Sequence, residues 1–412
     1  MAEKVDTSFT VGTEFTENGR TGTIHTPHGD IHTPAFIPVG TKATVKTLTP
    51  EQVKATGAQA VLANAYHLYL QPGPDIVDEA GGVAAFQNWG GPTYTDSGGF
   101  QVMSLGVGHK KVLMMDHVSQ EPVARAEKKD RYALVDEEGV NFRSVIDGSK
   151  HRFTPEISMQ IQHQLGADIM FAFDELTVLA DTREYQEASV DRTHRWAKRC
   201  LDEHDKLTRE RVDKPLQSLW GVVQGAQYED LRRKATRGLI ELSNQAEAEG
   251  WRGFGGFGIG GALEKENLGT IVGWVCDELP ATKPRHLLGI SEPDDLFRAI
   301  EAGADTFDCV APTRLGRRGG AYTLDGRVNL TAARFKRDFE PIDAEFGGYV
   351  SENYTRAYIH HLFKAKEFLG GTLCTIHNVS FIVRLVDNIR AAINGGYYED
   401  YKREFLGRYY HS

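Results

Sequence analysis

Cysteine is scarce in this chain of 412 residues, and the four cysteines lie far apart. Cys200, Cys276, Cys309 and Cys374 form no Cys-x-x-Cys pair. Such spacing indicates neither a disulfide framework nor a cysteine-rich metal site. We therefore expect a cytoplasmic protein in a reducing compartment.

Three other features are missing. No hydrophobic run approaches the length of a membrane span, and the first residues lack a signal-peptide pattern, so no membrane partner is expected. No Gly-x-Gly-x-x-Gly motif follows the first strand of the α/β part. Excess positive charge is also absent: the net charge is −10, which argues against broad, sequence-independent binding of nucleic acid. A local basic patch remains compatible with this charge.

The pattern of elements predicts an α/β protein. The pattern of residues 1–40 predicts β-structure with a hairpin, since residues 27–30 have the residue types of a turn. From Thr49, short apolar strands alternate with helices, and Thr-Pro-Glu marks helix starts at Thr49 and Thr154. About eight such units favour a closed (β/α)₈ barrel, a TIM barrel, with an open doubly wound sheet as the alternative.

Domain organisation follows from the two segments that break this rhythm. We expect a barrel domain over residues 1–333, with its N-terminal β entry and an insertion near 106–145. Residues 334–412 are expected to form a C-terminal helical subdomain.

Polar residues or glycines end several of the predicted strands. They are Asn64, Asp96, Asp174, Gln224, Gly258, Gly260 and Asp308. In a barrel all strands end at one rim, where such enzymes carry their active sites. Clustered carboxylates suit a divalent metal, or else two of them divide acid/base and nucleophile roles at an anomeric carbon. Asp174 and Gln224 could read the hydrogen-bonding edge of a heterocycle.

The strand that ends at Asp308 is followed by a basic segment. Arg314, Arg317 and Arg318 lie in what the prolines and glycines predict to be a loop. A carboxylate followed by such a loop suits a nucleophile or base beside a polyanion, although solvated arginines and a capping aspartate are the plainer interpretation of this stretch alone.

Several motifs together resemble one family, the tRNA-guanine transglycosylases, over almost the whole chain. The most specific are Asp-Ser-Gly-Gly-Phe-Gln at 96–101 and Phe-Asp-Cys-Val-Ala-Pro-Thr-Arg at 307–314. Matching segments also occur at 33–41, 64–68, 173–175, 222–225 and 360–362. The resemblance implies a (β/α)₈ barrel, usually a homodimer, that exchanges the wobble guanine in a tRNA anticodon loop for a 7-deazaguanine such as 7-aminomethyl-7-deazaguanine, in queuosine modification.

Roles for individual residues follow from the same resemblance. Asp308 matches the nucleophile that forms a covalent tRNA intermediate, and Asp96 matches its acid/base partner. The resemblance also implies base recognition by Asp174, Gln224 and the backbone at Gly256, a ring sandwiched by Phe100 and Leu288, tRNA contacts from Arg314, Arg317 and Arg318, and support of the aspartates by Asn64 and His67.

This sequence departs from the family in its zinc site and in its base pocket. Phe346, Gly348 and Ser351 stand at the positions of the three family cysteines, and only the histidine, His377, remains. One histidine cannot make a four-ligand site, so we expect no metal cofactor and a relic His377. Gly261 and Leu176 replace a glutamate and a cysteine of bacterial members, and Ile259 is expected to disfavour a large base substituent.

Two alternatives to an active transglycosylase stay open. One is a non-catalytic tRNA-binding partner subunit, which the retained aspartates disfavour. The other is a relative that acts on guanine in DNA, which the match at residues 312–314 disfavours.

Overall fold

The computed structural model describes residues 6–106 and 133–411. Its centre is a barrel of eight parallel strands, in which the second to the eighth strand each pair with the next along the chain and the eighth pairs with the first. The ring closes through a bridge between Val39 and Leu62. The barrel strands are β4 (Ala35–Pro38), β5 (Val61–Asn64), β6 (Thr93–Asp96), β10 (Ile169–Phe171), β11 (Ser218–Val223), β12 (Gly256–Ile259), β13 (Arg285–Leu287) and β14 (Thr306–Cys309). The predicted (β/α)₈ barrel is confirmed, and the open sheet is excluded.

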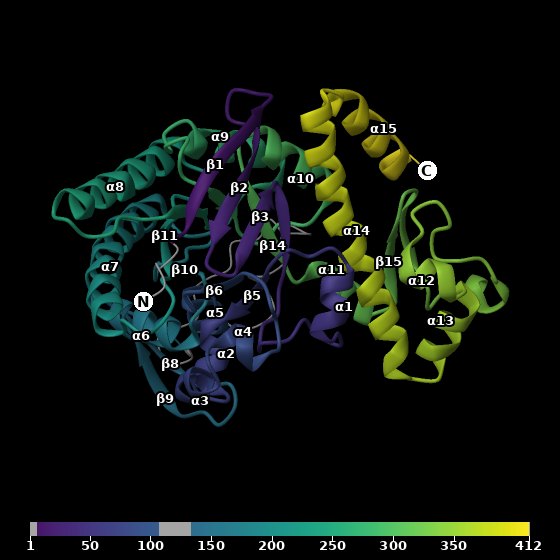
Figure 1. Cartoon of the computed structure of the whole chain (residues 1–412), viewed down its shortest axis with the longest axis horizontal. Coiled ribbons are helices and arrows are strands. Elements are labelled where there is room, and N and C mark those ends of the chain that lie inside the picture. The colour runs from purple at the N-terminus through teal and green to yellow at the C-terminus, as the bar shows by residue number, and fades with distance from the viewer. Residues whose placement is uncertain (1–5, 107–132, 412) are drawn as a thin grey trace.

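Helices surround the barrel on its outer side (Figure 1). They are α1 (Pro50–Ala55), α2 (Ala65–Leu70), α3 (Pro74–Glu79), α4 (Val83–Phe86), α5 (Gly99–Gly106), α6 (Pro155–Leu165), α7 (Arg183–Glu210), α8 (Glu229–Ala248), η2 (Lys265–Asn267), α9 (Leu268–Cys276), α10 (Pro293–Glu301) and α11 (Ala311–Arg317). The predicted helix starts are confirmed, since the Thr49 and Thr154 side chains cap α1 and α6, each with proline in the first turn.

Two hydrophobic layers fix the barrel. Side chains that point inward, such as Tyr94, Phe171 and Trp220, form an inner cluster. Side chains that point outward pack under the helices. Because the side chains of a strand alternate, neighbouring residues of β12 belong to different layers. This alternation decides which residues can reach the active site.

A small antiparallel sheet closes the amino end of the barrel. It comprises β1 (Ser8–Glu14), β2 (Arg20–Thr26) and β3 (Gly29–Thr33). Ile24 and Ile31 from this sheet join the inner cluster. Within the described residues, this sheet therefore covers the amino end of the barrel interior.

The insertion near residues 106–145 stays a prediction. Residues 107–132 lie outside the described residues. The part that follows forms an antiparallel sheet of β7 (Ala133–Val135), β8 (Val140–Arg143) and β9 (Lys150–Phe153). This sheet leads into α6, at the lower left of the molecule in Figure 1.

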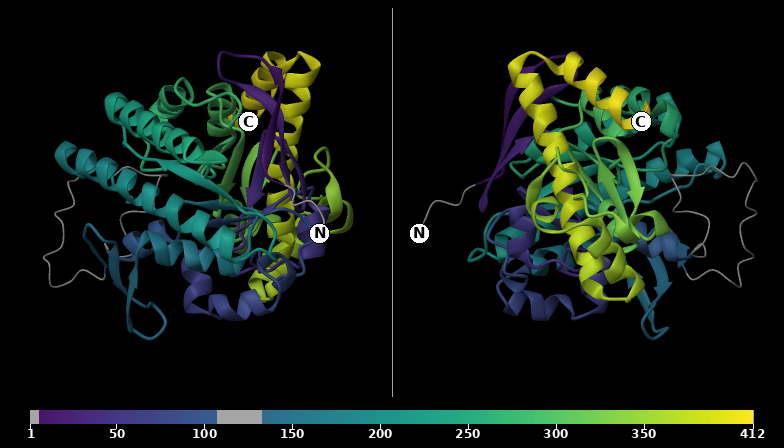
Figure 2. Two further views of the ribbon diagram at one scale, coloured as in Figure 1. Left: turned by 60° about the vertical axis from the view of Figure 1, so that its left-hand side comes forward. Right: turned by 90° about the vertical axis from the view of Figure 1, so that its right-hand side faces the viewer.

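The C-terminal part packs along one flank of the barrel. It contains β15 (Gly320–Thr323), β16 (Gly326–Asn329), η3 (Ala333–Arg337), α12 (Gly348–Asn353), α13 (Arg356–Lys364), α14 (Phe368–Gly395) and α15 (Tyr398–His411). The long helix α14 runs past the barrel and carries α12, α13 and β15 on its far side (Figures 1 and 2). The predicted boundary at 333 stays a prediction, and we call residues 320–380 the C-terminal lobe.

Helix α14 qualifies the statement that no segment approaches a membrane span. By length and composition it is the one described helix that could cross a membrane. However, 78% of its most apolar window is buried inside the protein. Asn378 of this helix also donates hydrogen bonds to the carbonyl oxygens of Pro312 and Gly320. These contacts are those of a core helix.

Candidate active site

The strand-end residues lie together at the carboxyl rim of the barrel. Asn64 and Asp96 are the last residues of the neighbouring strands β5 and β6 and are paired in register. Asp308 lies on β14, and Gln224 follows β11 directly. The barrel thus places residues that are more than 200 positions apart in the sequence at one opening.

Asp96 is surrounded by hydrogen-bond donors. Its Oδ1 accepts from the main-chain N–H of Ala65 (3.0 Å) and Gly98 (3.2 Å), and its Oδ2 accepts from Gln101 Nε2 (3.2 Å) and from Asn64 Nδ2. Burial raises the pKa of Asp96 to about 7, and the negative charge of Asp308 contributes, although the hydrogen bonds oppose the shift. A carboxyl group with this pKa can both donate and accept a proton near neutral pH.

Asp308 has a different environment. Its Oδ1 accepts from the main-chain N–H of Gly289 (3.2 Å) and lies 3.0 Å from Nε2 of His286. His286 is fully buried, and its Nδ1 lies 2.8 Å from Thr306 Oγ1. The sequence analysis missed His286, because one histidine in an apolar strand has no distinguishing pattern. It holds the carboxylate of Asp308 in a fixed direction.

Asp174 and Gln224 form a second polar pair. Gln224 Nε2 donates to Asp174 Oδ2 (2.5 Å), and Ser97 Oγ donates to Asp174 Oδ1 (3.3 Å). Burial raises the pKa of Asp174 to about 6, and Glu175 adds to the shift. Gln224 is 1% exposed, and its Oε1 has no hydrogen-bond partner. A buried acceptor without a partner in the protein is available to a hydrogen-bond donor of a ligand.

The structure does not bring Gly256 to this group. Gly256 is the first residue of β12, at the amino end of the barrel, where a Cβ atom would lie 2.6 Å from the Trp220 ring. Gly260 and Gly261 follow β12 at the rim instead. A Cβ atom on Gly260 would lie 3.1 Å from Gln224 Nε2, and one on Gly261 would lie 2.7 Å from Gln224 Oε1. Gly260, one of the predicted strand-end glycines, therefore lies beside Gln224 together with Gly261, whereas Gly256 does not.

Ile259 is also misplaced by the sequence analysis. Its side chain is fully buried in the outer cluster, between the barrel and its helices. The alternation of β12 points Gly258 and Gly260 inward, so Ile259 faces away from the pocket. The expectation that its bulk limits the base substituent is wrong.

Two predicted ring contacts border the same opening. Leu288 packs against the inner cluster, and its Cδ1 would lie 3.5 Å from a Cβ atom on Gly260. Phe100 is 38% exposed and follows Gly99, whose close neighbours include Asp174. Their sandwich around a planar ring stays a prediction.

Positive charge gathers beside the rim. The predicted loop of the three arginines is wrong in part, because Ala311–Arg317 forms α11 with proline in its first turn. Burial lowers the pKa of Arg317, and the neighbouring Arg314 and Arg318 lower it further. Burial and the charges of Arg317, Lys42 and Arg314 lower the pKa of Lys46 in the same way. The cationic patch therefore includes two lysines that the sequence analysis did not single out.

His67 lies near this patch and does not contact the aspartates through its side chain. Burial, with Lys42 and Lys46, lowers the pKa of His67 to about 4. Its main-chain N–H donates to Asn64 Oδ1 (3.0 Å), while Asn64 contacts Asp96 directly. The support expected from His67 is thus a backbone contact.

The residues at the position of the family's zinc site do not fit a metal. Nε2 of His377 lies 2.7 Å from the carbonyl oxygen of Tyr322, and the Phe346 ring meets the His377 ring edge-on at 5.4 Å. The guanidinium of Arg384 lies over Phe346 at 4.2 Å. Among the residues that the structure describes, no three His, Cys, Asp or Glu side chains are placed to hold a metal. An aromatic and cation–π cluster occupies the position instead.

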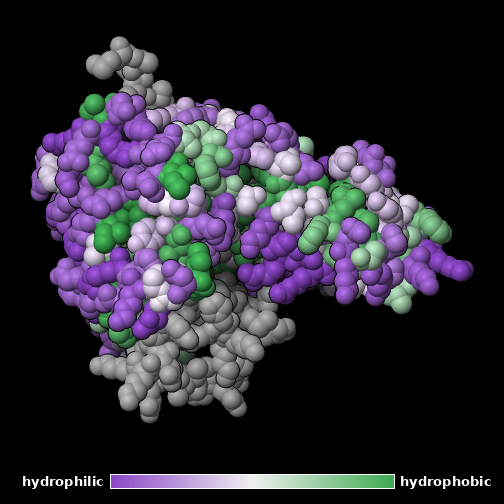
Figure 3. All heavy atoms as spheres, turned by 90° about the horizontal axis from the view of Figure 1, so that it is seen from below, coloured by the Kyte–Doolittle hydropathy of each residue, from purple (hydrophilic) through white to green (hydrophobic). Residues whose placement is uncertain are grey.

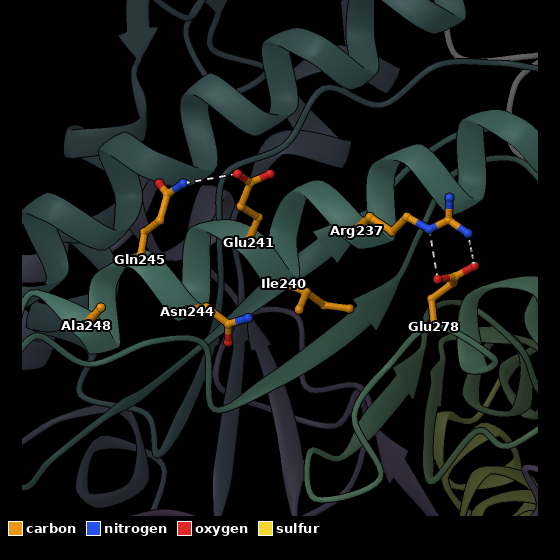
Figure 4. Close-up of a pocket in the computed structure, with 7 residues that line it drawn as sticks. All are labelled: Arg237, Ile240, Glu241, Asn244, Gln245, Ala248 and Glu278. Atoms are coloured by element: carbon orange, nitrogen blue, oxygen red, sulfur yellow. Dashed lines mark hydrogen bonds and ion pairs between the residues drawn. The ribbon is translucent and has the colours of Figure 1, made fainter.

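A separate surface groove of about 550 Å³ lies along α8 (Figure 4). Its charged groups bind one another: Arg237 is paired with Glu278, and Gln245 donates to Glu241. None of the rim residues lines this groove. It therefore has no part in the site.

Comparisons with known proteins agree with this geometry. The carboxyl rim and its carboxylates define an enzyme of the (β/α)₈-barrel class. Residues 16–411 match the family model described as Queuine tRNA-ribosyltransferase. The chain belongs to this family of pentosyltransferases. It is 44% identical over 406 residues to the queuine tRNA-ribosyltransferase of Pelotomaculum thermopropionicum, covering 98% of each chain. It is 43% identical to that of Bacillus subtilis, over 95% of this chain and 92% of the relative.

Proposed function

We propose that this protein is a tRNA-guanine transglycosylase, which exchanges the wobble guanine of tRNA for a 7-deazaguanine in queuosine modification. The observation that carries the proposal is the pairing of Asp96 and Asp308 at one rim, with their charges coupled and their environments different. Two carboxylates whose surroundings differ can divide proton transfer and nucleophilic attack between them.

In the first half-reaction Asp308 attacks the anomeric carbon of the ribose. The bond from this carbon to the guanine nitrogen breaks, an ester to Asp308 forms, and Asp96 gives its proton to the leaving base. In the second half-reaction Asp96 takes a proton from the incoming base, whose nitrogen displaces Asp308. The pKa of about 7 supports this double role for Asp96.

Asp174, Gln224 and the main chain of Gly260 and Gly261 read the base in this proposal. A carboxylate accepts the two N–H groups of the guanine edge, and an amide N–H donates to its carbonyl oxygen. Phe100 and Leu288 cover the two ring faces. The favoured incoming base is 7-aminomethyl-7-deazaguanine or a related 7-deazaguanine, because these share the same edge.

The cationic patch of Arg314, Arg317, Arg318, Lys42 and Lys46 binds phosphates of the anticodon loop. Burial and the neighbouring positive charges lower the pKa of Arg317 and of Lys46, and this supports the role, since a polyanion would relieve the repulsion between the charges. An overall charge of −10 confines tRNA to this patch.

The C-terminal lobe needs no zinc, and it serves in a cytoplasmic homodimer. The absence of a zinc requirement is supported by the described residues around His377, which form no group of three or more His, Cys, Asp or Glu side chains that could hold a metal ion. The homodimer is supported by exposed apolar side chains of the lobe, including Phe339, Tyr349, Tyr358, Phe368 and Leu369. In the space-filling view, hydrophobic side chains gather along the arm that this lobe forms (Figure 3).

The test is incorporation of labelled guanine into unmodified tRNA by purified protein, with and without a strong chelator, with bound metal measured on the same sample. We expect incorporation by metal-free protein and none by Asp308→Asn. Failure of folded wild-type protein would refute an active enzyme on its own. Activity restored by adding a second, different chain would then favour a non-catalytic partner subunit. Incorporation of guanine into DNA would favour a relative that acts on DNA. Stoichiometric zinc would refute the metal-free lobe.

A further inference from the structure

Arg232 is a buried cation that the proposed reaction does not use. It lies on α8 and is 0% exposed. Its Nε donates to the carbonyl oxygen of Ala226 (2.8 Å), and its Nη1 donates to those of Val223 (3.1 Å) and Gly260 (2.7 Å). Its Nη2 has no hydrogen-bond partner. One guanidinium therefore joins the loops that follow β11 and β12.

No carboxylate of the described residues forms an ion pair with Arg232. Burial is the sole cause that lowers its pKa, to about 9, so the group stays protonated at neutral pH. By contrast, the buried Arg20 is paired with Asp305 at 2.9 Å. Burying a charge without an ion-pair partner costs folding free energy, so a role of Arg232 other than stabilising the fold is expected.

The unpaired Nη2 points toward the base-reading groups. A Cβ atom on Gly261 would lie 3.2 Å from this nitrogen and 2.7 Å from the unpaired Gln224 Oε1. Gly261 has a φ of +84°, a backbone conformation that residues with a side chain rarely adopt. Within the described residues its N–H also has no acceptor. Three unpaired polar groups thus meet around Gly261, and Arg232 holds the preceding carbonyl.

We propose that Arg232 is a positioning residue for base recognition. It fixes the Gly260 carbonyl so that the N–H of Gly261 turns toward the base, and its positive charge favours a base with a carbonyl oxygen at that edge. The inference rests on the proposed function. Arg232 would in this way make the site prefer oxopurines to aminopurines, because the amino group of an aminopurine would place a hydrogen-bond donor beside a positive charge.

The matched control is Arg285, a second buried arginine at the amino end of β13. Its guanidinium donates to the carbonyl oxygens of Asn18, Gly303, Cys276 and Leu279 and is likewise free of an ion pair among the described residues. The variants Arg232→Met and Arg285→Met therefore remove the same kind of buried contact at opposite ends of the barrel. Arg232→Lys keeps the charge and loses the fixed geometry.

The experiment measures base exchange with guanine at saturating tRNA, KM for tRNA at saturating guanine, and thermal unfolding. We expect Arg232→Met to raise KM for guanine about 10–100-fold, with KM for tRNA unchanged. Arg285→Met should lower the unfolding temperature with both KM values unchanged. Arg232→Lys should fall between Arg232→Met and the wild type, and it decides the matter if Arg232→Met does not fold.

Equal KM values for guanine in the folded Arg232 variants and the wild type would overturn the proposal, because a merely structural arginine would behave like Arg285. A rise in KM for guanine in both Met variants would overturn it as well. Absence of exchange in the wild type would instead refute the proposed function, so the two failures are distinguishable.

Discussion

His286 should control the reactivity of Asp308, and replacing it tests the proposed nucleophile without changing the carboxylate itself. The ring lies 3.0 Å from Asp308 Oδ1, and the second contact to that oxygen is the Gly289 N–H at 3.2 Å. A hydrogen bond to a charged group contributes about 1.5–3 kcal/mol. Losing it should therefore slow attack by about 10–150-fold, since 1.36 kcal/mol corresponds to a factor of ten.

Two nearly isosteric variants separate the ends of the ring. His286→Gln places an amide near the position of Nε2 and can still donate to Asp308. His286→Asn places its amide near Nδ1 and can bond only to Thr306, which lies 2.8 Å from that atom in the wild type. We expect His286→Gln to stay within about fivefold of wild type and His286→Asn to show the full loss.

The assay is single-turnover formation of the covalent tRNA–protein adduct without incoming base, resolved on a denaturing gel. Thermal unfolding of each variant controls for packing, because the ring lies 5.2 Å from Phe171 and 5.7 Å from Tyr94. Equal adduct rates in folded His286→Asn and wild type would refute the positioning role. A loss of similar size in both variants would show that the imidazole itself is required.

Three further predictions concern other parts of the chain. Because Asp96 must carry a proton when guanine leaves and its pKa is raised to about 7, adduct formation should fall above pH 7, and a flat rate from pH 6 to 9 would exclude this role. The raised pKa values of Asp96 and Asp174 also mean that the folded state binds protons more tightly than the unfolded state, so the free energy of unfolding should decrease as the pH rises from about 4 to 7. Denaturant unfolding of Asp96→Asn should show a smaller decrease over the same pH range. Arg317→Ala should weaken tRNA binding and reduce the slope of log Kd against log salt by about 0.7, whereas an unchanged slope would place Arg317 outside the interface.

The sequence alone predicted the barrel and the aspartates of the rim for a physical reason. Strand–helix alternation and polar strand ends are local patterns, and a closed parallel barrel converts strand ends into neighbours. Asp96, Asp174 and Asp308 could be found in this way.

Other parts of the site depend on information that a linear pattern does not carry. The family resemblance implies base recognition by the backbone at Gly256, whereas Gly260 and Gly261 lie beside Gln224, because β12 ends at Ile259 and only the glycines after it reach the rim. Ile259 was misjudged because a shift of one position reverses the face of a strand. Arg232 resembles any arginine of an amphipathic helix until the fold buries it.

The ring of Phe346, packed against His377 and covered by Arg384, has a consequence for how the lobe responds to its surroundings. In a metal-bound lobe, the stability gained from binding grows with the logarithm of the free ion concentration. Packing of a phenyl ring carries no such dependence, and it offers oxidants no thiolate. In the proposed zinc-free lobe, the folding free energy does not depend on zinc supply, and it varies with temperature as hydrophobic burial does.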